Sequence, residues 1–471
     1  MNRRDFLMGA ACAGFAPAQT RQSRPHNFVF LLTGDQRHDA MGCAGNSAIL
    51  TPNIDALARR GVLFTNAFVT TSVSSASRAA TATGRYGSSN GVMGLGGGLD
   101  PAERTFVPTL RMSGYRTGFT GKWPLEMPAT PTAAGFDRDV HFVSDGPHRN
   151  RKLLEAGEPA IAKGFIEDYL AESAIDFLEA SAKTSDPFFL QISTQLPRMN
   201  EDLEWAATDK TLAQYRGRPM PIPANWKDDL AGKPAYLREG RHREQGDACG
   251  YQERSKLENH VRQYYSTVTE LDRSLGKVFA AIDRLGLRKN TYVVLMGDNG
   301  WLLGEHGLSG KVLAYEDSMR IPLVIAGPGI RPDRDGRMAM NVDVAPTILE
   351  LAGLPAPQGV HGRSLKPLLN RRRTKWRGSV YYEALKPALG SWPVLAVRSY
   401  AWKYIQTFHL ENPSMLIFEE LYDLENDPGE LANLSGALTH RSIQNQMRDE
   451  LEELRSEFGN VETQTSALLL R

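Results

Sequence analysis

The fold is decided by residues 27–36, NFVFLLTGDQ, in which an apolar run ends in a glycine and an aspartate. A continuous apolar run is typical of a strand that is buried on both faces of a parallel sheet. Residues 291–299, TYVVLMGDN, repeat the pattern and end in Asp298 and Asn299. Because sites in such sheets form outside the carboxyl ends of strands, Asp35 and Asp298 are predicted to lie at one sheet edge.

Strands and helices alternate outward from these two runs, which predicts an α/β fold with a mostly parallel sheet flanked by helices. Further strands are expected at residues 116–120, 187–192 and 322–325, and helices at residues 51–60, 167–182, 257–287 and 343–351. After about residue 364 the pattern changes to short strands at 379–382, 394–398, 403–407 and 419–422, followed by a charged helix at 440–458. We expect a small antiparallel sheet with a packed terminal helix there.

The composition excludes several classes of protein. The chain has 471 residues, with 55 Lys and Arg against 54 Asp and Glu. Such a balance gives no general attraction for nucleic acid or for an anionic membrane. Three cysteines cannot build a disulfide scaffold. Cys43 and Cys249 are left open as either one disulfide or two free thiols.

The N-terminus predicts an export signal over residues 1–20. Arg3-Arg4 precedes an apolar run from Leu7 to Ala16, and Ala16-Pro17-Ala18 has the form of a cleavage site. The arginine pair is twin-arginine-like, and an ordinary secretory signal is the alternative. The run is too short to span a bilayer, and no later segment is apolar enough to anchor the chain. The expected location is periplasmic or extracellular, without a membrane anchor.

Residues 71–85, TSVSSASRAATATGR, predict a helix that begins near Ser77. A helix N-terminus offers free N–H groups to an oxyanion, and Arg78 adds a planar fork that suits a tetrahedral anion. Ser74 would lie there as a nucleophile or its precursor, whereas a tight packing turn is the simpler interpretation. Oxygens of Asp35, Asp298 and Asn299 could bind a hard divalent cation, although Asp and Asn also simply form turns.

These residues carry a family resemblance. Ser74-x-Ala76-Ser77-Arg78 followed by Thr83-Gly84-Arg85 resembles the sulfatase signature, and other sulfatase landmarks follow in order between about residues 27 and 460. They include Thr51-Pro52-Asn53, Gly121-Lys122-Trp123, Leu303-Gly304-Glu305-His306-Gly307 with Lys311, Asp343 to Ile348, and Leu421-Tyr422-Asp423-Leu424. Within the family, the chain is most similar to the N-acetylglucosamine-6-sulfatase-like branch.

The resemblance implies an alkaline-phosphatase-like fold with a catalytic domain at residues 25–366 and a small C-terminal subdomain at residues 367–471. It implies hydrolysis of sulfate esters, on a sulfated sugar or glycan, with Ca²⁺ or Mg²⁺ bound. Ser74 would be oxidised to formylglycine by a formylglycine-generating enzyme, and its hydrate would attack sulfur. The resemblance assigns catalytic roles to Ser74, Arg78, Lys122, His306 and Lys311, metal ligation to Asp35, Asp298 and Asn299, and substrate binding to Arg198.

Four positions depart from the family pattern. Gly34 stands where the family has an acidic residue, and Pro124 and Arg198 each stand where the family has histidine. Ser74 replaces the commoner cysteine. Loss of one acid or base commonly costs about 10²–10⁴ in rate. Two alternatives therefore stay open, a sulfated-glycan binder without turnover and a phosphate-ester hydrolase that uses unmodified Ser74.

Residues 199–252 form a long excursion without clear periodicity, which is typical of a functional rim. Its aromatic residues suit stacking on sugar rings but equally suit local packing. They are Trp205, Tyr215, Trp226 and Tyr236.

Overall fold

A large sheet forms the centre of the protein in the computed structural model, which describes residues 25–96, 98–100, 103–124, 127, 130–200 and 202–459. This 10-stranded sheet has the order β13-β2-β12-β9-β1-β8-β4-β5-β6-β7. Its strands are β1 (Asn27–Thr33), β2 (Gly61–Phe64), β4 (Arg116–Trp123), β5 (Arg138–Val143), β6 (Arg149–Glu155), β7 (Glu158–Phe165), β8 (Phe188–Ser193), β9 (Thr291–Gly297), β12 (Leu323–Ala326) and β13 (Asp333–Asp335).

The centre of the sheet is parallel. β1 pairs in parallel with β8 and β9, and β4 pairs in parallel with β8 and β5. Antiparallel pairs lie outside this centre, where β12 joins β9 to β2 and where β6 joins β5 to β7. The predicted α/β fold with a mostly parallel sheet is confirmed. The carboxyl ends of β1, β4, β8 and β9 therefore open at the same edge.

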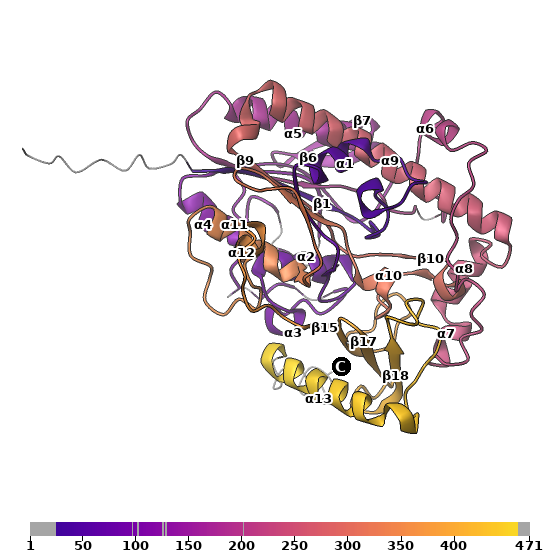
Figure 1. Cartoon of the computed structure of the whole chain (residues 1–471). Helices are drawn as coiled ribbons and strands as arrows, with labels where there is room; N and C mark the ends of the chain where they lie inside the picture. The colour runs from indigo at the N-terminus through magenta and orange to yellow at the C-terminus, as the bar shows by residue number, and fades with distance from the viewer. Residues whose placement is uncertain are drawn as a thin grey trace, which may run out of the picture.

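Helices cover both faces of the sheet (Figure 1). The longer or more central ones are α1 (Pro52–Ala58), α2 (Ser74–Thr83), α4 (Phe106–Met112), α5 (Ile166–Ser181), α9 (Arg254–Arg284) and α11 (Val344–Leu351), whereas α13 (Arg441–Phe458) lies outside this sheet. The short ones are α3 (Gly87–Asn90), α6 (Asp209–Gln214), α7 (Tyr236–Glu239), α8 (Arg241–Ala248), α10 (Glu316–Met319) and α12 (Lys366–Leu369).

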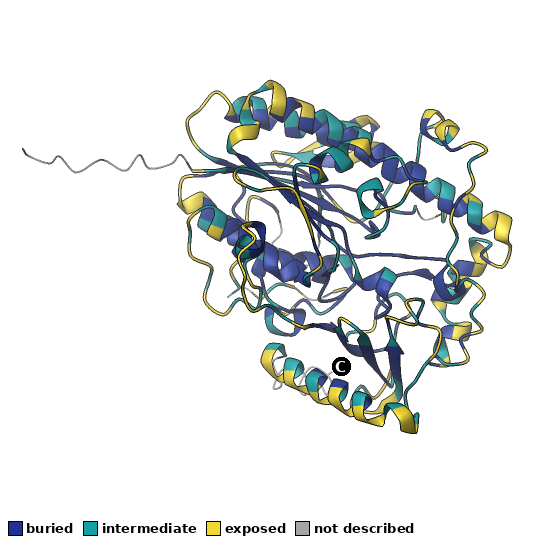
Figure 2. Cartoon of the chain, in the orientation of Figure 1, coloured by how far each residue is buried: buried dark blue, intermediate teal, exposed yellow. Residues whose placement is uncertain are grey.

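Alternating side chains of the central strands bury two separate cores. Phe28 and Phe30 of β1 pack in one cluster with α2, α4 and α11, whereas Val29 and Leu31 pack in another with α1, α5 and α9. Because neighbouring residues of a strand point to opposite faces, both faces must be covered. In Figure 2 the central strands are accordingly dark, while the outer faces of α5 and α13 are exposed.

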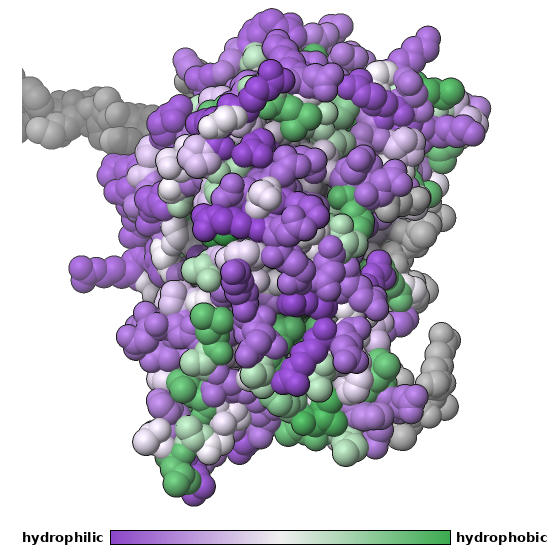
Figure 3. Space-filling model, turned by 90° about the vertical axis from the view of Figure 1, so that its right-hand side faces the viewer, coloured by the Kyte–Doolittle hydropathy of each residue, from purple (hydrophilic) through white to green (hydrophobic). Residues whose placement is uncertain are grey.

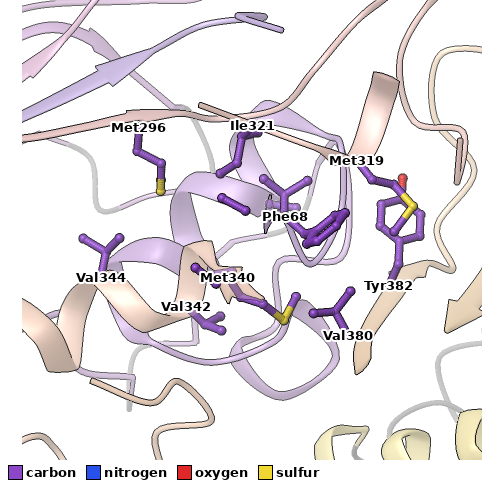
Figure 4. Close-up of a cluster of buried hydrophobic side chains, with 14 of the residues drawn as sticks. Phe68, Met296, Met319, Ile321, Met340, Val342, Val344, Val380 and Tyr382 are labelled. Carbon is purple, nitrogen blue, oxygen red and sulfur yellow. The ribbon is translucent and has the colours of Figure 1, made fainter. Parts of the chain in front are cut away.

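A smaller antiparallel sheet adjoins the first core, as predicted. It contains β15 (Ser379–Ala384), β16 (Val394–Ser399), β17 (Trp402–Phe408) and β18 (Leu416–Asp423), and α13 packs against it. Figure 4 shows Val380 and Tyr382 of β15 beside Phe68 and Met319 of the large unit. The hydrophobic core is therefore continuous between the two units, and the division between residues 366 and 367 stays a prediction.

Two parts of the sheet differ from the sequence-based expectation, and the predicted signal lies outside the residues that the structure describes. The β5–β6–β7 meander and the short β2 were not predicted from the sequence. Cys43 and Cys249 are both free thiols. Among the described residues, no helix is both long and apolar enough to cross a bilayer. The predicted signal at residues 1–20 lies outside the described residues.

Candidate active site

Two adjacent strand ends form the floor of the site. In the pairing of β1 with β9, Thr33 lies opposite Gly297, so Asp35 and Asp298 leave the sheet side by side. The backbone N–H of Asp35 donates to Asp298 Oδ1 at 3.0 Å, and both residues are fully buried. Asp35 has a φ of 59°, a left-handed conformation that aspartate adopts more readily than most residues. The sharp turn there directs its carboxylate back toward the second strand.

Ser74 is the first residue of α2. Val73 before it is extended and provides no capping side chain, so the first N–H groups of the helix have no side-chain cap. They carry the positive end of the helix dipole. At the other end, Gly84 takes a left-handed φ of 71° and its N–H donates to the carbonyl of Ala80. The expected start near Ser77 is wrong by about one turn.

The Ser74 hydroxyl connects this helix to the strand ends. Oγ donates to Asn299 Oδ1 at 3.0 Å and accepts from Lys311 Nζ at 2.8 Å. The same ammonium group donates to Asp35 Oδ1 at 2.5 Å and to Asn299 Oδ1 at 3.2 Å. Asn299 Nδ2 in turn donates to Asp35 Oδ1 at 2.7 Å. The candidate nucleophile is therefore in direct contact with a buried cation.

Asp35 is held in its ionised form. Burial by itself would raise its pKa, but Lys311 and Arg198 outweigh burial and lower the pKa to about 2. Arg198 Nη1 lies 3.2 Å from Asp35 Oδ2. Both carboxylate oxygens of Asp35 therefore face cationic side chains.

Arg78 lies one helical turn after Ser74 and bridges two strands. Its Nε lies 2.9 Å from Asp298 Oδ2, and its Nη1 donates to the carbonyl of Lys122 at 3.1 Å. Its Nη2 is buried and has no hydrogen-bond partner among the residues that the structure describes. The nearest side-chain space is at Gly34, where an added Cβ would lie 3.7 Å from Nη2. A buried donor left unpaired is costly, which indicates a place for an anionic ligand.

Lys122 and Arg198 share the carboxylate of Asp145. Lys122 Nζ lies 2.6 Å from Asp145 Oδ1, and Arg198 Nη2 lies 2.6 Å from Asp145 Oδ2. Burial, with help from Arg198 and Arg78, lowers the pKa of Lys122 to about 8 against the opposing effect of Asp145. Arg198 Nε is buried without a partner among the described residues. Asp145 was missed by sequence reasoning, because it lies in a loop after β5 without any motif.

The loop that carries Arg198 is fixed from α5. Glu167 Oε1 accepts the backbone N–H groups of Gln195 and Leu196 at 2.7 and 2.8 Å. Burial raises the pKa of Glu167 to about 7, although these two hydrogen bonds oppose the rise. Glu167 therefore positions the chain after β8 without contacting the other charged groups of the site.

His306 lies apart from these contacts. Its Nδ1 is 2.7 Å from Asp228 Oδ2, and its ring centroid is 4.9 Å from that of Tyr315. Burial, reinforced by Lys233, lowers the pKa of His306 to about 4 against the effect of Asp228. None of its hydrogen bonds among the described residues reaches Ser74, so its predicted catalytic role stays a prediction.

A pocket of about 920 Å³ opens beside the charged cluster. Arg198, Lys311 and Asp145 line it, together with Trp301 and with α8. The side of the molecule that carries α8 is mostly hydrophilic (Figure 3). In α8, His242 contacts the Lys311 carbonyl at 2.6 Å through Nε2, a link that sequence reasoning did not find. The pocket therefore suits a polar, anionic ligand.

The excursion at residues 199–252 contributes to the pocket, but not through its aromatic residues. Met199, Leu203 and Gln245 are among its lining residues. Trp205 and Tyr215 are instead buried in a separate cluster, and Tyr236 stacks on Trp392 with centroids 5.0 Å apart. The interpretation of local packing is therefore the better one for these three aromatic residues.

The donor set fits a divalent cation poorly. Ca²⁺ takes 6–8 oxygen ligands and Mg²⁺ a near-ideal octahedron. Here Asp35 and Asp298 accept from nitrogen donors on every carboxylate oxygen, and Gly34 has no side chain to offer. Among the described residues, no group of three or more His, Cys, Asp or Glu side chains could hold a metal ion. The ligand set predicted from the sequence is assembled in space, but as part of an ion-pair network.

Comparisons with known proteins agree with one another. The family described as Sulfatase matches residues 26–354, and the family described as N-sulphoglucosamine sulphohydrolase, C-terminal, matches residues 304–457. An N-acetylglucosamine-6-O-sulfatase of Bacteroides thetaiotaomicron is 29% identical, with 96% of this chain and 90% of the relative covered. Human arylsulfatase A is 30% identical, with 92% and 87% covered.

The fold is also shared with solved structures. A protein solved in complex with its substrate D-glucosamine-2-N,6-O-disulfate superimposes with a TM-score of 0.83 at 26% identity, covering 94% of this chain and 99% of that one. The two units of the molecule therefore occur together in a single known architecture.

Proposed function

Because the chain belongs to the sulfatase family, we propose that it hydrolyses a sulfate ester on a sugar at the site that contains Ser74. Support for a sulfated amino sugar comes from the relative described as an N-acetylglucosamine-6-O-sulfatase and from the similar structure that holds a glucosamine disulfate. The pocket of about 920 Å³ that Lys311 and Arg198 line has room for at least a monosaccharide.

The contacts of the Ser74 hydroxyl support hydrolysis at this site. The Ser74 hydroxyl lies 2.8 Å from Lys311 Nζ at the uncapped N-terminus of α2, while Arg78 Nη2 and Arg198 Nε are buried donors without partners among the described residues. Donors that are fixed in advance are suited to stabilising negative charge that develops in a reaction. Two buried guanidinium groups around Ser74 therefore each have a donor left for an anionic ligand.

The catalytic roles follow from these positions. Oxidation of Ser74 to formylglycine, a modification that sulfatases generally carry, would supply a hydrated aldehyde whose oxygen attacks sulfur. Lys311 Nζ lies 2.8 Å from Ser74 Oγ and would hold that oxygen, and its ammonium group would pass a proton to the departing sugar oxygen. Arg78, Lys122 and Arg198 would neutralise the sulfate oxygens. Sulfatases generally also use a divalent metal, but the donor set of this site fits one poorly.

Export belongs to the same proposal. A signal at residues 1–20 would deliver the chain to the periplasm or the medium, and a formylglycine-generating enzyme would be its partner. Intact mass of the exported protein tests both points. Signal removal is expected to shorten the chain near Ala18, and conversion of Ser74 is expected to remove two hydrogen atoms from the mass.

The replacement of two histidines favours a second candidate, a binder of sulfated sugars without turnover. Pro124 cannot carry a proton, and Arg198 stays charged near neutral pH. Among the described residues, no histidine side chain hydrogen-bonds with Ser74. Hydrolysis of a panel of sulfated monosaccharides and of phosphate esters separates the candidates, with Ser74→Ala as the control. We expect sulfate release that Ser74→Ala abolishes. Binding without release would support the binder, and release of phosphate alone would support a phosphate-ester hydrolase.

A further inference from the structure

The charged side chains around Ser74 already carry a net positive charge. Three carboxylates, those of Asp35, Asp145 and Asp298, are linked by ion pairs to Arg78, Lys122, Arg198 and Lys311. A divalent cation added to this set would raise an existing excess of positive charge in a buried place. Removal of charges from water is expensive unless they are paired, so such an addition is unfavourable.

Nitrogen donors occupy the oxygens that would hold a metal. Asp35 Oδ1 accepts from Lys311 and Asn299, and its Oδ2 faces Arg198. Asp298 Oδ1 accepts from the backbone N–H of Asp35, and its Oδ2 faces Arg78. A metal ion there would have to compete with these donors, three of which belong to cationic side chains.

The Arg198 side chain reaches this point from a different strand. It follows β8, spans from Asp145 to Asp35, and exposes about a quarter of its surface toward the pocket. Asp35 and Asp145 together raise its pKa against the effect of burial, so it is cationic at every ordinary pH. A guanidinium group is planar and matches a tetrahedral oxyanion with paired N–H groups.

Gly34 leaves space rather than a metal ligand. A Cβ added there would meet Arg78 Nη2 and the carbonyls of Gln195 and Thr194 at 3.7 to 3.8 Å, which is ordinary van der Waals contact. The Cβ of a larger residue would therefore fit at position 34, but the glycine present there offers no side-chain ligand. The space lies against the free Nη2 of Arg78.

We propose that Arg198 replaces the divalent metal in this protein, so that the site binds the sulfate group through Arg198, Arg78 and Lys311 without a bound cation. This inference rests on the proposed site at Ser74 and names the group that supplies its charge. It removes the need for an acid at position 34. It also explains why a permanently charged residue stands at position 198, because an arginine there would repel a metal ion bound at Asp35.

Inorganic sulfate is the probe, because its binding can be measured whether or not the protein turns over an ester. The full chain is purified with and without EDTA, its calcium and magnesium content is measured, and sulfate affinity is measured by calorimetry. We expect less than one metal ion per ten chains and the same affinity in EDTA. Arg198→Gln should weaken sulfate binding about 10- to 100-fold. Arg254→Gln, at an exposed arginine of α9 that does not line this pocket, should change it less than about threefold.

A double variant gives the reciprocal test. Gly34→Asp combined with Arg198→Gln adds an acid and removes the cation, and calcium should then stabilise the protein against heat where it does not stabilise the original chain. One metal ion per chain with loss of sulfate binding in EDTA would overturn the inference, and so would unchanged sulfate affinity in Arg198→Gln. Sulfate binding that resists EDTA without any ester hydrolysis would sink the proposed hydrolase function and leave this inference standing.

Discussion

The two halves of the site differ in how their polar atoms are paired. At the ends of β1 and β9, Asp35 and Asp298 are fully buried and every carboxylate oxygen has a donor. At the ends of β4 and β8, Lys122 and Arg198 share one partly exposed carboxylate, and Arg198 Nε lacks a partner among the described residues. We call the fully paired half, at Asp35 and Asp298, the frame. We call the other half, at Lys122 and Arg198, the open half, because it still has a donor that can bind an anion.

The largest effect is expected where the two halves meet, at Lys311. Lys311→Met removes the cation that contacts both Ser74 and Asp35. It leaves a buried carboxylate with a weaker set of partners, which typically costs about 3–5 kcal/mol in free energy of unfolding. Sulfate-ester hydrolysis should fall by at least about 10³-fold, because proton transfer and charge stabilisation are lost together. Urea unfolding and initial rates measure the two losses.

A compensating variant separates stability from catalysis. Lys311→Met combined with Asp35→Asn removes both charges of the buried pair, so much of the lost stability should return. Activity should not return, since the contact with Ser74 stays absent. Hydrolysis within tenfold of the original rate in Lys311→Met would mean that the frame does not take part in the reaction.

The next effect concerns Lys122 in the open half. Because its pKa is lowered to about 8, it is cationic at pH 7 and loses its proton as the pH rises above 8. Sulfate affinity should therefore fall about tenfold between pH 7 and pH 9.5. In Lys122→Arg the charge persists and this part of the decrease should disappear. An identical pH profile in both proteins would assign the decrease to another group.

A smaller effect is expected from Glu167, whose carboxylate accepts backbone N–H groups of the loop that carries Arg198. Its pKa is raised from 4.5 to about 7 in the folded chain. Between these two values the folded state holds a proton that the unfolded state has released, so stability falls as the pH rises through this window. The full effect is about 3 kcal/mol. In Glu167→Gln, where an amide oxygen still accepts from Gln195 and Leu196, urea unfolding at pH 5, 6, 7 and 8 should show a flatter profile.

The frame was predictable from sequence because it follows from local patterns. Apolar runs that end in Gly-Asp identify β1 and β9, and a parallel sheet brings their ends together. The position of Ser74 follows from the small-residue run, although the helix begins earlier than expected, since the extended Val73 is itself the N-cap. Long-range pairing could not be predicted. Asp145 acquires its role only when β5 lies beside β4, and nothing in its own neighbourhood of the sequence indicates that role.

The smallest effect is expected at His306, which belongs to neither half. Burial, with Lys233 nearby, lowers its pKa to about 4, so the ring is neutral above pH 5, and its Nδ1 is engaged with Asp228. His306→Gln should reduce the free energy of unfolding by about 1–2 kcal/mol through that hydrogen bond. It should change kcat/KM by less than about threefold, because no contact joins it to Ser74 among the described residues. A loss of kcat well beyond threefold, with stability unchanged, would support the catalytic role that the resemblance implies. The site would then extend past the ion-pair network toward Asp228 and Tyr315.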